Sequence, residues 1–186
     1  MKQFRFIATI ATMVFFFTCG WAGAEQAPQK VVDLANSTLA KLGTDPVIVA
    51  AVRAENAKGK TLDQIKDMDG KWKATPGIAD YMQALMSSDC GQYLRKTLNS
   101  QPYYAEIFVM DNQGANVAMS DKTSDYWQGD EAKFQKSYNG GNGAVFVDEV
   151  EFDDSTQAYL CQVSVPVIDG GKVIGAITIG VDVEKI

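Results

Sequence analysis

The spacing of the apolar residues changes near Tyr103, from a helical repeat before it to alternation after it. Residues three or four apart share one face of a helix, whereas every second residue shares one face of a strand. The sequence therefore predicts helices over residues 25–102 and strands over residues 103–186. Because no linker separates the two halves, we expect a single α+β domain.

Helix start and stop signals divide the first half into five expected helices. Pro28 opens a long N-terminal helix that ends at Gly43, since glycine accepts the left-handed conformation of a helix end. Asp45-Pro46 caps and starts the second helix, and Thr61-x-x-Gln64 forms a capping box before a short third one. Two more helical stretches follow, at residues 75–87 and 89–98.

Five strands are expected in the second half, with a loop and a short helix inserted after the second strand. Gly114 suits the positive φ of the turn after the first strand, and the last two connections suit hairpins. If the first strand lies beside the fifth, the two hairpin groups close into one antiparallel sheet of order 2-1-5-4-3. The strands are residues 104–110, 115–120, 144–152, 156–167 and 172–183, with the loop at 123–129 and the helix at 130–138.

Alternation gives the expected sheet one bulky face and one face with little side-chain volume near its centre. In the last strand Ile177, Ile179 and Val181 are bulky, while Thr178 and Gly180 between them are small. Small residues can make room for a ligand above a sheet, or they can seat a closely packed helix. The sequence leaves both interpretations open.

The first 24 residues have the layout of a secretory signal peptide. Lys2 and Arg5 are basic, residues 6–17 form an apolar run, and Ala22-Gly23-Ala24 is a small-x-small cleavage site. An uncleaved anchor is the alternative, but a spanning helix needs about 20 apolar residues. We therefore expect cleavage of the leader and a single domain, residues 25–186, secreted into the periplasm.

Cleavage would leave two cysteines, Cys90 and Cys161. Cys19 lies in the leader, where the preceding Thr18 disfavours lipidation. An oxidising compartment favours a disulfide between the remaining two, which would close a loop of about 70 residues and stabilise the fold by about 4 kcal/mol. Two separately buried thiols are the alternative, because Cys161 lies in a strand pattern.

The chain contains no histidine, and its formal net charge is −6. It therefore lacks Ser-His-Asp or Cys-His catalytic machinery and any imidazole ligand for zinc. The negative charge argues against a nucleic-acid partner, which would need a basic face. We expect no enzyme activity, no metal and no cofactor. A carboxylate-based hydrolase ranks last, because no two carboxylates pair convincingly in the sequence.

An acidic cluster lies in and after the third expected strand. Calcium needs a loop that wraps oxygen ligands around one ion, and no Asp-x-Asp-x-Asp-Gly loop occurs here. Alternation is expected to send the strand members of the cluster to opposite faces of the sheet. Solvated edge and turn charges are therefore the expected interpretation for Asp148, Glu149, Glu151, Asp153 and Asp154.

A set of motifs follows in a fixed order along the second half. It comprises Asp111-x-x-Gly114 between two strands, the loop Ser124-Asp125-Tyr126-Trp127-x-Gly129-Asp130, the segment Val163-Ser164-Val165-Pro166-Val167, and Gly171-Lys172-x-Ile174-Gly175 before the last strand. In this set, residues 104–186 resemble the Cache family, the PAS-like extracellular sensor domains of bacterial chemoreceptors and sensor kinases. The length suits a single Cache module.

The resemblance implies a PAS-like five-stranded sheet behind a long N-terminal helix and short helices. It also implies a pocket over the central sheet that binds small molecules, typically carboxylates or amino acids, without chemistry. Family members usually continue into a membrane helix and a cytoplasmic signalling module, whereas this sequence ends at Ile186. We therefore expect a secreted sensor domain that acts through a separate membrane-bound receptor or kinase, with no stable membrane insertion after cleavage.

Four candidate ligand-binding residues lie in or after the expected loop. Tyr126 and Trp127 can line a pocket with aromatic surface and a hydroxyl or indole donor, or they can anchor the loop to the core. Lys133 and Lys136 lie three apart on the expected helix and can pair with a carboxylate ligand, or they can face solvent.

Three more candidates come from other elements. Ser120 and Gln162 point toward the small-residue face and can orient a ligand, or they can satisfy backbone groups. Arg95 can offer a bidentate fork to a carboxylate, although a surface position is the stronger expectation. The leading hypothesis is a sensor that holds a small carboxylate or amino acid between the sheet and residues 123–138. A ligand-free protein-interaction or scaffold domain is the alternative.

Overall fold

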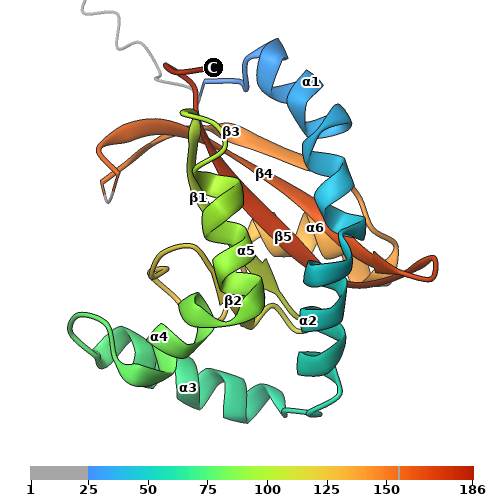
Figure 1. The fold of residues 1–186 in the computed structure, drawn as a ribbon, viewed down its shortest axis with the longest axis vertical. Coiled ribbons are helices and arrows are strands. Elements are labelled where there is room, and N and C mark those ends of the chain that lie inside the picture. Colours follow the sequence, from blue (N-terminus) through green and yellow to red (C-terminus); the bar gives the residue numbers. More distant parts are fainter. Residues whose placement is uncertain (1–24, 155) are drawn as a thin grey trace, which may run out of the picture.

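The computed structural model describes residues 25–154 and 156–186 (Figure 1). The predicted leader, residues 1–24, lies outside the described residues. The helices are α1 (Gln29–Ser37), α2 (Pro46–Asn56), α3 (Leu62–Ala74), α4 (Asp80–Ser87), α5 (Asp89–Leu98) and α6 (Ala132–Tyr138), with 3-10 segments η1 (Leu39–Thr44) and η2 (Asn139–Gly141). Within this part of the chain, no helix has the length and apolar character needed to cross a bilayer.

The starts of α2, α3 and α5 are those expected, and four helix boundaries differ. α4 begins at Asp80 rather than at residue 75. Asp45 accepts a hydrogen bond from Val47 N at 2.9 Å, and the capping box before α3 is formed. The first helix changes to the tighter η1 after Ser37, where Gly43 packs so closely on β4 that a Cβ would lie 2.1 Å from Pro166 O. α3 is 13 residues long rather than short, because tertiary contacts described below extend it. α6 begins at Ala132 rather than at residue 130.

The strands are β1 (Tyr104–Met110), β2 (Asn116–Met119), β3 (Phe146–Asp153), β4 (Ala158–Asp169) and β5 (Lys172–Asp182). They form one antiparallel sheet of order β2-β1-β5-β4-β3, which confirms the expected order. In the β1–β2 turn Gly114 has φ 85°. The Asp111 side chain caps this turn, because it accepts hydrogen bonds from Gln113 N at 2.8 Å and Ala115 N at 3.0 Å.

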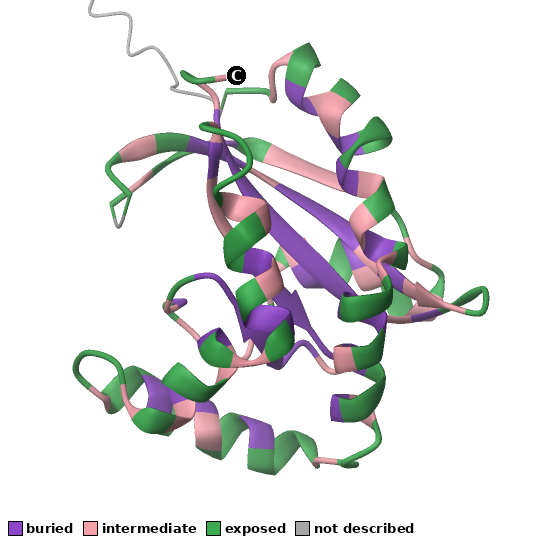
Figure 2. Ribbon diagram, in the orientation of Figure 1, coloured by how far each residue is buried: buried purple, intermediate pink, exposed green. Residues whose placement is uncertain are grey.

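The sheet separates two hydrophobic clusters, and its central strands are the most deeply buried part of the fold (Figure 2). α1, α2 and α5 cover the bulky face, where Ile177 and Ile179 of β5 are fully buried. α6 packs on the other face against β4 and β5, with Phe134 in the same cluster as Phe108 and Ala176. α3 and α4 extend from this cluster near β2 (Figure 1).

The two cysteines of the domain, Cys90 and Cys161, are free and buried. The structure therefore has separate thiols instead of the expected disulfide. Cys90 lies on α5, which packs on β1 and β2, whereas Cys161 lies in β4, beyond β5. Each strand step is about 4.8 Å, and a disulfide needs Cα atoms within about 7 Å. Burial raises the pKa of Cys90 to about 12 and that of Cys161 to about 11, so both thiols stay protonated.

Candidate functional site

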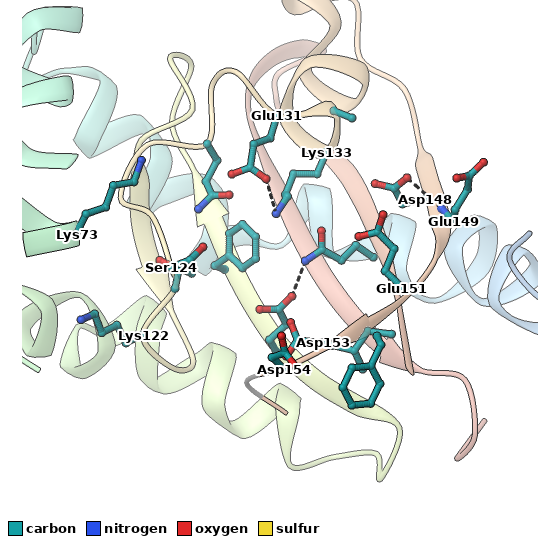
Figure 3. Close-up of a pocket in the computed structure, with 18 of the residues that line it drawn as sticks. Lys73, Lys122, Ser124, Glu131, Lys133, Asp148, Glu149, Glu151, Asp153 and Asp154 are labelled. Atoms are coloured by element: carbon teal, nitrogen blue, oxygen red, sulfur yellow. Dashed lines mark hydrogen bonds and ion pairs between the residues drawn. The ribbon is translucent and has the colours of Figure 1, made fainter. Parts of the chain in front are cut away.

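A cavity of about 730 Å³ lies beside α6 on the less bulky face of the sheet (Figure 3). Its floor consists of Glu106 and Phe108 from β1 and of Leu160 and Gln162 from β4. The loop between β2 and α6, the start of α6, the last turn of α3 and the strand β3 form its walls. A cavity of this size can enclose a small organic molecule.

The floor carries a carboxylate, Glu106, that lies across the centre of the sheet. Glu106 and Gln162 both face Gly180 of β5 in the strand register, and Gln162 Nε2 donates a hydrogen bond to Glu106 Oε1 at 2.7 Å. A Cβ on Gly180 would lie 2.6 Å from Glu106 Cγ, so the missing side chain makes room for this carboxylate. Burial raises the pKa of Glu106, and the hydrogen bond from Gln162 opposes that rise.

The substitution Gly180→Ala should displace the Glu106 side chain. The new Cβ would also lie 3.3 Å from Leu160 Cδ1, so Glu106 must rotate and lose its bond to Gln162. We expect the free energy of unfolding to fall by about 1 kcal/mol, measured by urea denaturation. Gly70→Ala is the control, because a Cβ there meets open space on α3 and should stabilise the helix. A crystal structure of Gly180→Ala with the Glu106–Gln162 bond intact would contradict the expectation.

The loop wall of the cavity is held from α3. Trp72 Nε1 donates a hydrogen bond to Thr123 O at 2.8 Å. Asp69 Oδ1 accepts hydrogen bonds from Tyr126 N at 2.9 Å and from Trp127 N at 3.1 Å. Trp72 also lines the cavity, and its ring lies 5.6 Å from that of Tyr126. These contacts explain why α3 is longer than its sequence pattern suggests, since its last turns are stabilised by the loop that they position.

Gln128 is a buried amide in the same wall, with 1% of its surface exposed. Its Nε2 donates a hydrogen bond to Asp125 O at 3.0 Å, which assigns the orientation of the amide. Among the described residues no donor reaches Gln128 Oε1. A buried acceptor without a donor costs about 1–3 kcal/mol. This wall can therefore be stabilised by a ligand that supplies an N–H or O–H group.

The opposite wall is acidic and comes from β3 and the residues just after it. Figure 3 shows Glu149, Glu151, Asp153 and Asp154 on one side of the cavity and Lys73 and Lys122 on the other. The expectation that alternation separates the acidic cluster is wrong, because Asp148 and the other four acids line one cavity. A β-bulge between Val147 and Val150 shifts the register of β3 and interrupts its alternation.

Three lysines line the cavity against seven carboxylates, so its electrostatic character is negative. Lys133 lies at the start of α6 and pairs with Glu131 at 2.8 Å, while its Nζ lies 5.6 Å from the centroid of the Phe108 ring. Within the described residues, no group of three histidine, cysteine or acidic side chains is arranged to hold a metal ion.

Two of the seven candidate residues, Lys133 and Gln162, line the cavity. Tyr126 and Trp127 lie outside its lining and anchor their loop. Tyr126 is 4% exposed and its hydroxyl accepts a hydrogen bond from Lys60 Nζ at 3.0 Å. Trp127 Nε1 donates to the backbone oxygen of Gln113 at 2.8 Å. Both rings are therefore engaged by the fold rather than turned toward the cavity.

Three further candidates also lie outside the cavity lining. Ser120 Oγ accepts a hydrogen bond from Ile107 N at 2.9 Å, so it satisfies a backbone group between β1 and β2. Arg95 donates to the backbone oxygen of Ser120 and pairs with Asp121 at 3.3 Å. Lys136 is exposed on α6, with its Nζ 4.4 Å from the centroid of the Phe146 ring.

Sequence reasoning missed most of the lining residues, among them Glu106 and Gln128. The sequence does indicate Glu106, because it is the only charged residue in the otherwise apolar strand Tyr104–Met110. The sequence does not indicate Gln128, because the burial of its side chain depends on how α3 packs against the loop. The acidic wall was visible as a cluster, but its orientation depended on a bulge that the sequence does not indicate.

Comparison with known proteins gives structural matches only. No family model matches the chain, and no curated protein matches it. The fold is that of Cache-type sensor domains, found in histidine kinases and chemoreceptors. One solved example is the sensor domain of the Vibrio cholerae histidine kinase DctB, with 14% identity and a TM-score of 0.50 over 84% of this chain and 51% of that one. This chain thus spans about half the length of that sensor domain.

Two weaker structural matches come from chemoreceptors. The sensory domain of Campylobacter jejuni Tlp3 with isoleucine bound is 20% identical over 85% of this chain and 64% of that one, with a TM-score of 0.37. The ligand-binding domain of the Pseudomonas aeruginosa amino acid chemoreceptor PctC in complex with GABA is 10% identical over 84% and 60%, also with a TM-score of 0.37.

Proposed function

We propose that residues 25–186 form a single small-molecule-binding sensor module whose ligand occupies the cavity between the sheet, α6 and the loop before α6. The observation that carries this proposal is Glu106, a carboxylate on the floor of a cavity of about 730 Å³, which hydrogen-bonds an amide and pairs with no cation among the described residues. Desolvated ionisable groups in large concave sites are typical of ligand recognition. This role requires no catalysed reaction.

The proposed ligand carries an amino group. Of the two classes that the resemblance implies, amino acids suit this cavity better than simple carboxylates, because acidic side chains outnumber lysines around it. Lys133 and Gln162 belong to the proposed site. Gln162 orients Glu106, and Lys133 balances part of the charge of Glu131.

We further propose that the domain acts in the periplasm after removal of its leader. A ligand that contacts the loop wall would change the surface formed by this loop and α3, because Asp69 and Trp72 couple the two. A membrane-bound receptor or kinase that recognises this surface would then respond to the ligand. Such a partner is consistent with the fold, which also serves as the sensor domain of the histidine kinase DctB.

Thermal-shift screening of amino acids, amines and carboxylates tests the sensor function. We expect one compound class to raise the melting temperature by several degrees, as mass action requires for a ligand well above its Kd. Gln162→Ala should then weaken binding by about tenfold in calorimetry, since Glu106 loses its orienting hydrogen bond. Gln83→Ala is the control, because Gln83 is exposed on α4 and outside the cavity lining. Equal affinities for the two variants would place the ligand elsewhere.

A ligand-free protein-interaction domain is the second candidate function. Phe152 and Tyr159 of the β3–β4 hairpin are 50% and 49% exposed and form an edge-to-face pair with centroids 5.2 Å apart. Exposed aromatic pairs are typical of binding surfaces for other proteins. A screen in which no compound changes the melting temperature would favour this candidate over the sensor.

A further inference from the structure

The hydrogen-bond donors around the cavity are already used by the protein itself. Lys122 Nζ donates to two backbone carbonyls, at 3.0 and 2.8 Å. Lys73 Nζ bridges two carboxylates that lie outside the cavity lining, at 2.8 and 2.6 Å. Lys133 is paired with Glu131. A ligand carboxylate would therefore have to compete with existing partners at each of these lysines.

Several of the acceptors around the cavity form no ion pair within the described part of the chain. Within residues 25–154 and 156–186, no ion pair is formed by Asp148, Glu149 or Glu151. Glu106 receives a hydrogen bond from an amide rather than from a cation. Gln128 Oε1 is buried in the wall across the cavity from β3, and no described donor reaches it. The lining can therefore still bind a positively charged group or an N–H donor of a ligand.

We propose, building on the sensor function above, that the ligand of this cavity is a linear alkyl diamine or polyamine, an organic cation without a carboxylate. One ammonium group donates to Gln128 Oε1 in the loop wall, and another pairs with the carboxylates of β3. The methylene chain between them lies over the apolar floor residues Phe108 and Leu160. Ammonium groups both supply the donor that Gln128 lacks and offset the excess of carboxylates.

A ligand with a carboxylate fits this arrangement less well. Its negative charge would lie among seven carboxylates, and like charges held close together repel one another. An amino acid would gain one contact through its ammonium group, but its carboxylate would lose binding free energy among the carboxylates of the lining. The number of carboxylates on the ligand should therefore set the order of affinity.

Three ligands with a four-carbon backbone test this order by calorimetry on the leaderless domain. They are 1,4-diaminobutane, 4-aminobutyrate and succinate, which carry zero, one and two carboxylates on chains of equal length. We expect the diamine to bind at least about tenfold more tightly than 4-aminobutyrate, and succinate to bind more weakly than either. Spermidine, which has a third amine, should bind at least as tightly as the diamine.

Charge-neutral substitutions locate the site. Glu106→Gln and Glu151→Gln should each weaken binding of 1,4-diaminobutane by about tenfold, and Gln128→Leu, which removes the free acceptor, should do the same. Asp67→Asn is the matched control, because Asp67 is exposed on α3 and outside the cavity lining. It removes one negative charge and should leave the affinity unchanged. Melting temperatures measured without ligand show whether each variant is folded.

Several results would overturn the proposal. Tighter binding of 4-aminobutyrate or succinate, with sensitivity to Gln162→Ala, would keep the sensor function and reject the diamine class. If Asp67→Asn weakened binding as much as the cavity variants do, the diamine would be attracted only by the net charge of the protein and not by the cavity. Stabilisation by calcium chloride but not by diamines, reversed by a chelator, would assign the acidic wall to a metal ion. No binding by any amine, amino acid or carboxylate would reject the proposed sensor function as well.

Discussion

Replacing Trp72 with alanine is expected to lower the free energy of unfolding by about 3–5 kcal/mol, the range for aromatic-to-alanine changes in a core. Trp72 is 1% exposed, and its ring lies 5.6 Å from Tyr126 and 6.0 Å from Tyr81. The substitution removes these contacts and leaves Thr123 O without its indole donor. Urea denaturation followed by circular dichroism measures the loss, and calorimetry on the folded fraction measures ligand affinity.

Trp72→Phe separates packing from the hydrogen bond. Phenylalanine keeps most of the apolar contact with Tyr126 but cannot donate to Thr123 O. We expect a smaller destabilisation, about 1–2 kcal/mol, from the hydrogen bond and the lost volume. If Trp72→Phe were as destabilising as Trp72→Ala, the indole hydrogen bond and not the packing would hold the loop. If Trp72→Ala were near neutral, α3 would not position the loop wall.

Replacing Asp69 with alanine should cost about 3 kcal/mol, because two backbone N–H groups lose one shared acceptor. Asp69 is 8% exposed, and its Oδ1 accepts from Tyr126 N and Trp127 N. Without this carboxylate the loop before α6 has no attachment of equal strength to the middle of α3. We expect faster hydrogen exchange at these two amides in addition to the lower stability.

Two matched variants isolate the hydrogen bonds of Asp69 from its charge. Asp69→Asn keeps an oxygen that can accept from Tyr126 N and should retain most of the stability. Lys73→Ala removes only the ion pairs of a side chain that is 53% exposed, and such pairs contribute about 1 kcal/mol or less. Stability of Asp69→Ala equal to that of Lys73→Ala would show that the backbone hydrogen bonds are unimportant for the loop.

The fold depends on local signals that can be recognised in the sequence and on tertiary contacts that cannot. The cap at Asp45, the capping box of Thr61 and Gln64, and the turn at Gly114 each act within a few residues. For this reason the starts of α2 and α3 and the hairpins were predictable, and the order of the sheet followed from two hairpin groups that close around β5. The extra length of α3 was not predictable, because Trp72 and Asp69 are stabilised by a loop about fifty residues later in the chain.

The candidate site was predictable only where strand alternation continues without interruption. Gln162 points to the cavity as expected, because β4 keeps its register with β5 along this stretch. Tyr126 and Trp127 have the chemistry of pocket residues, yet the fold uses their hydroxyl and indole groups to anchor the loop. Residue type predicted what these side chains can do, and packing decided which partner each one has.

The sequence by itself determined the α+β class, the strand order and the sheet face that carries little side-chain volume. It did so because hydrophobic period, caps and turns depend on near neighbours in the chain. Only the tertiary structure decided the character of the cavity. The bulge between Val147 and Val150 brings the acids of β3 to one wall, and Gly180 lets Glu106 lie on the floor. The charge of a site depends on which distant segments meet there, and no local pattern encodes that meeting.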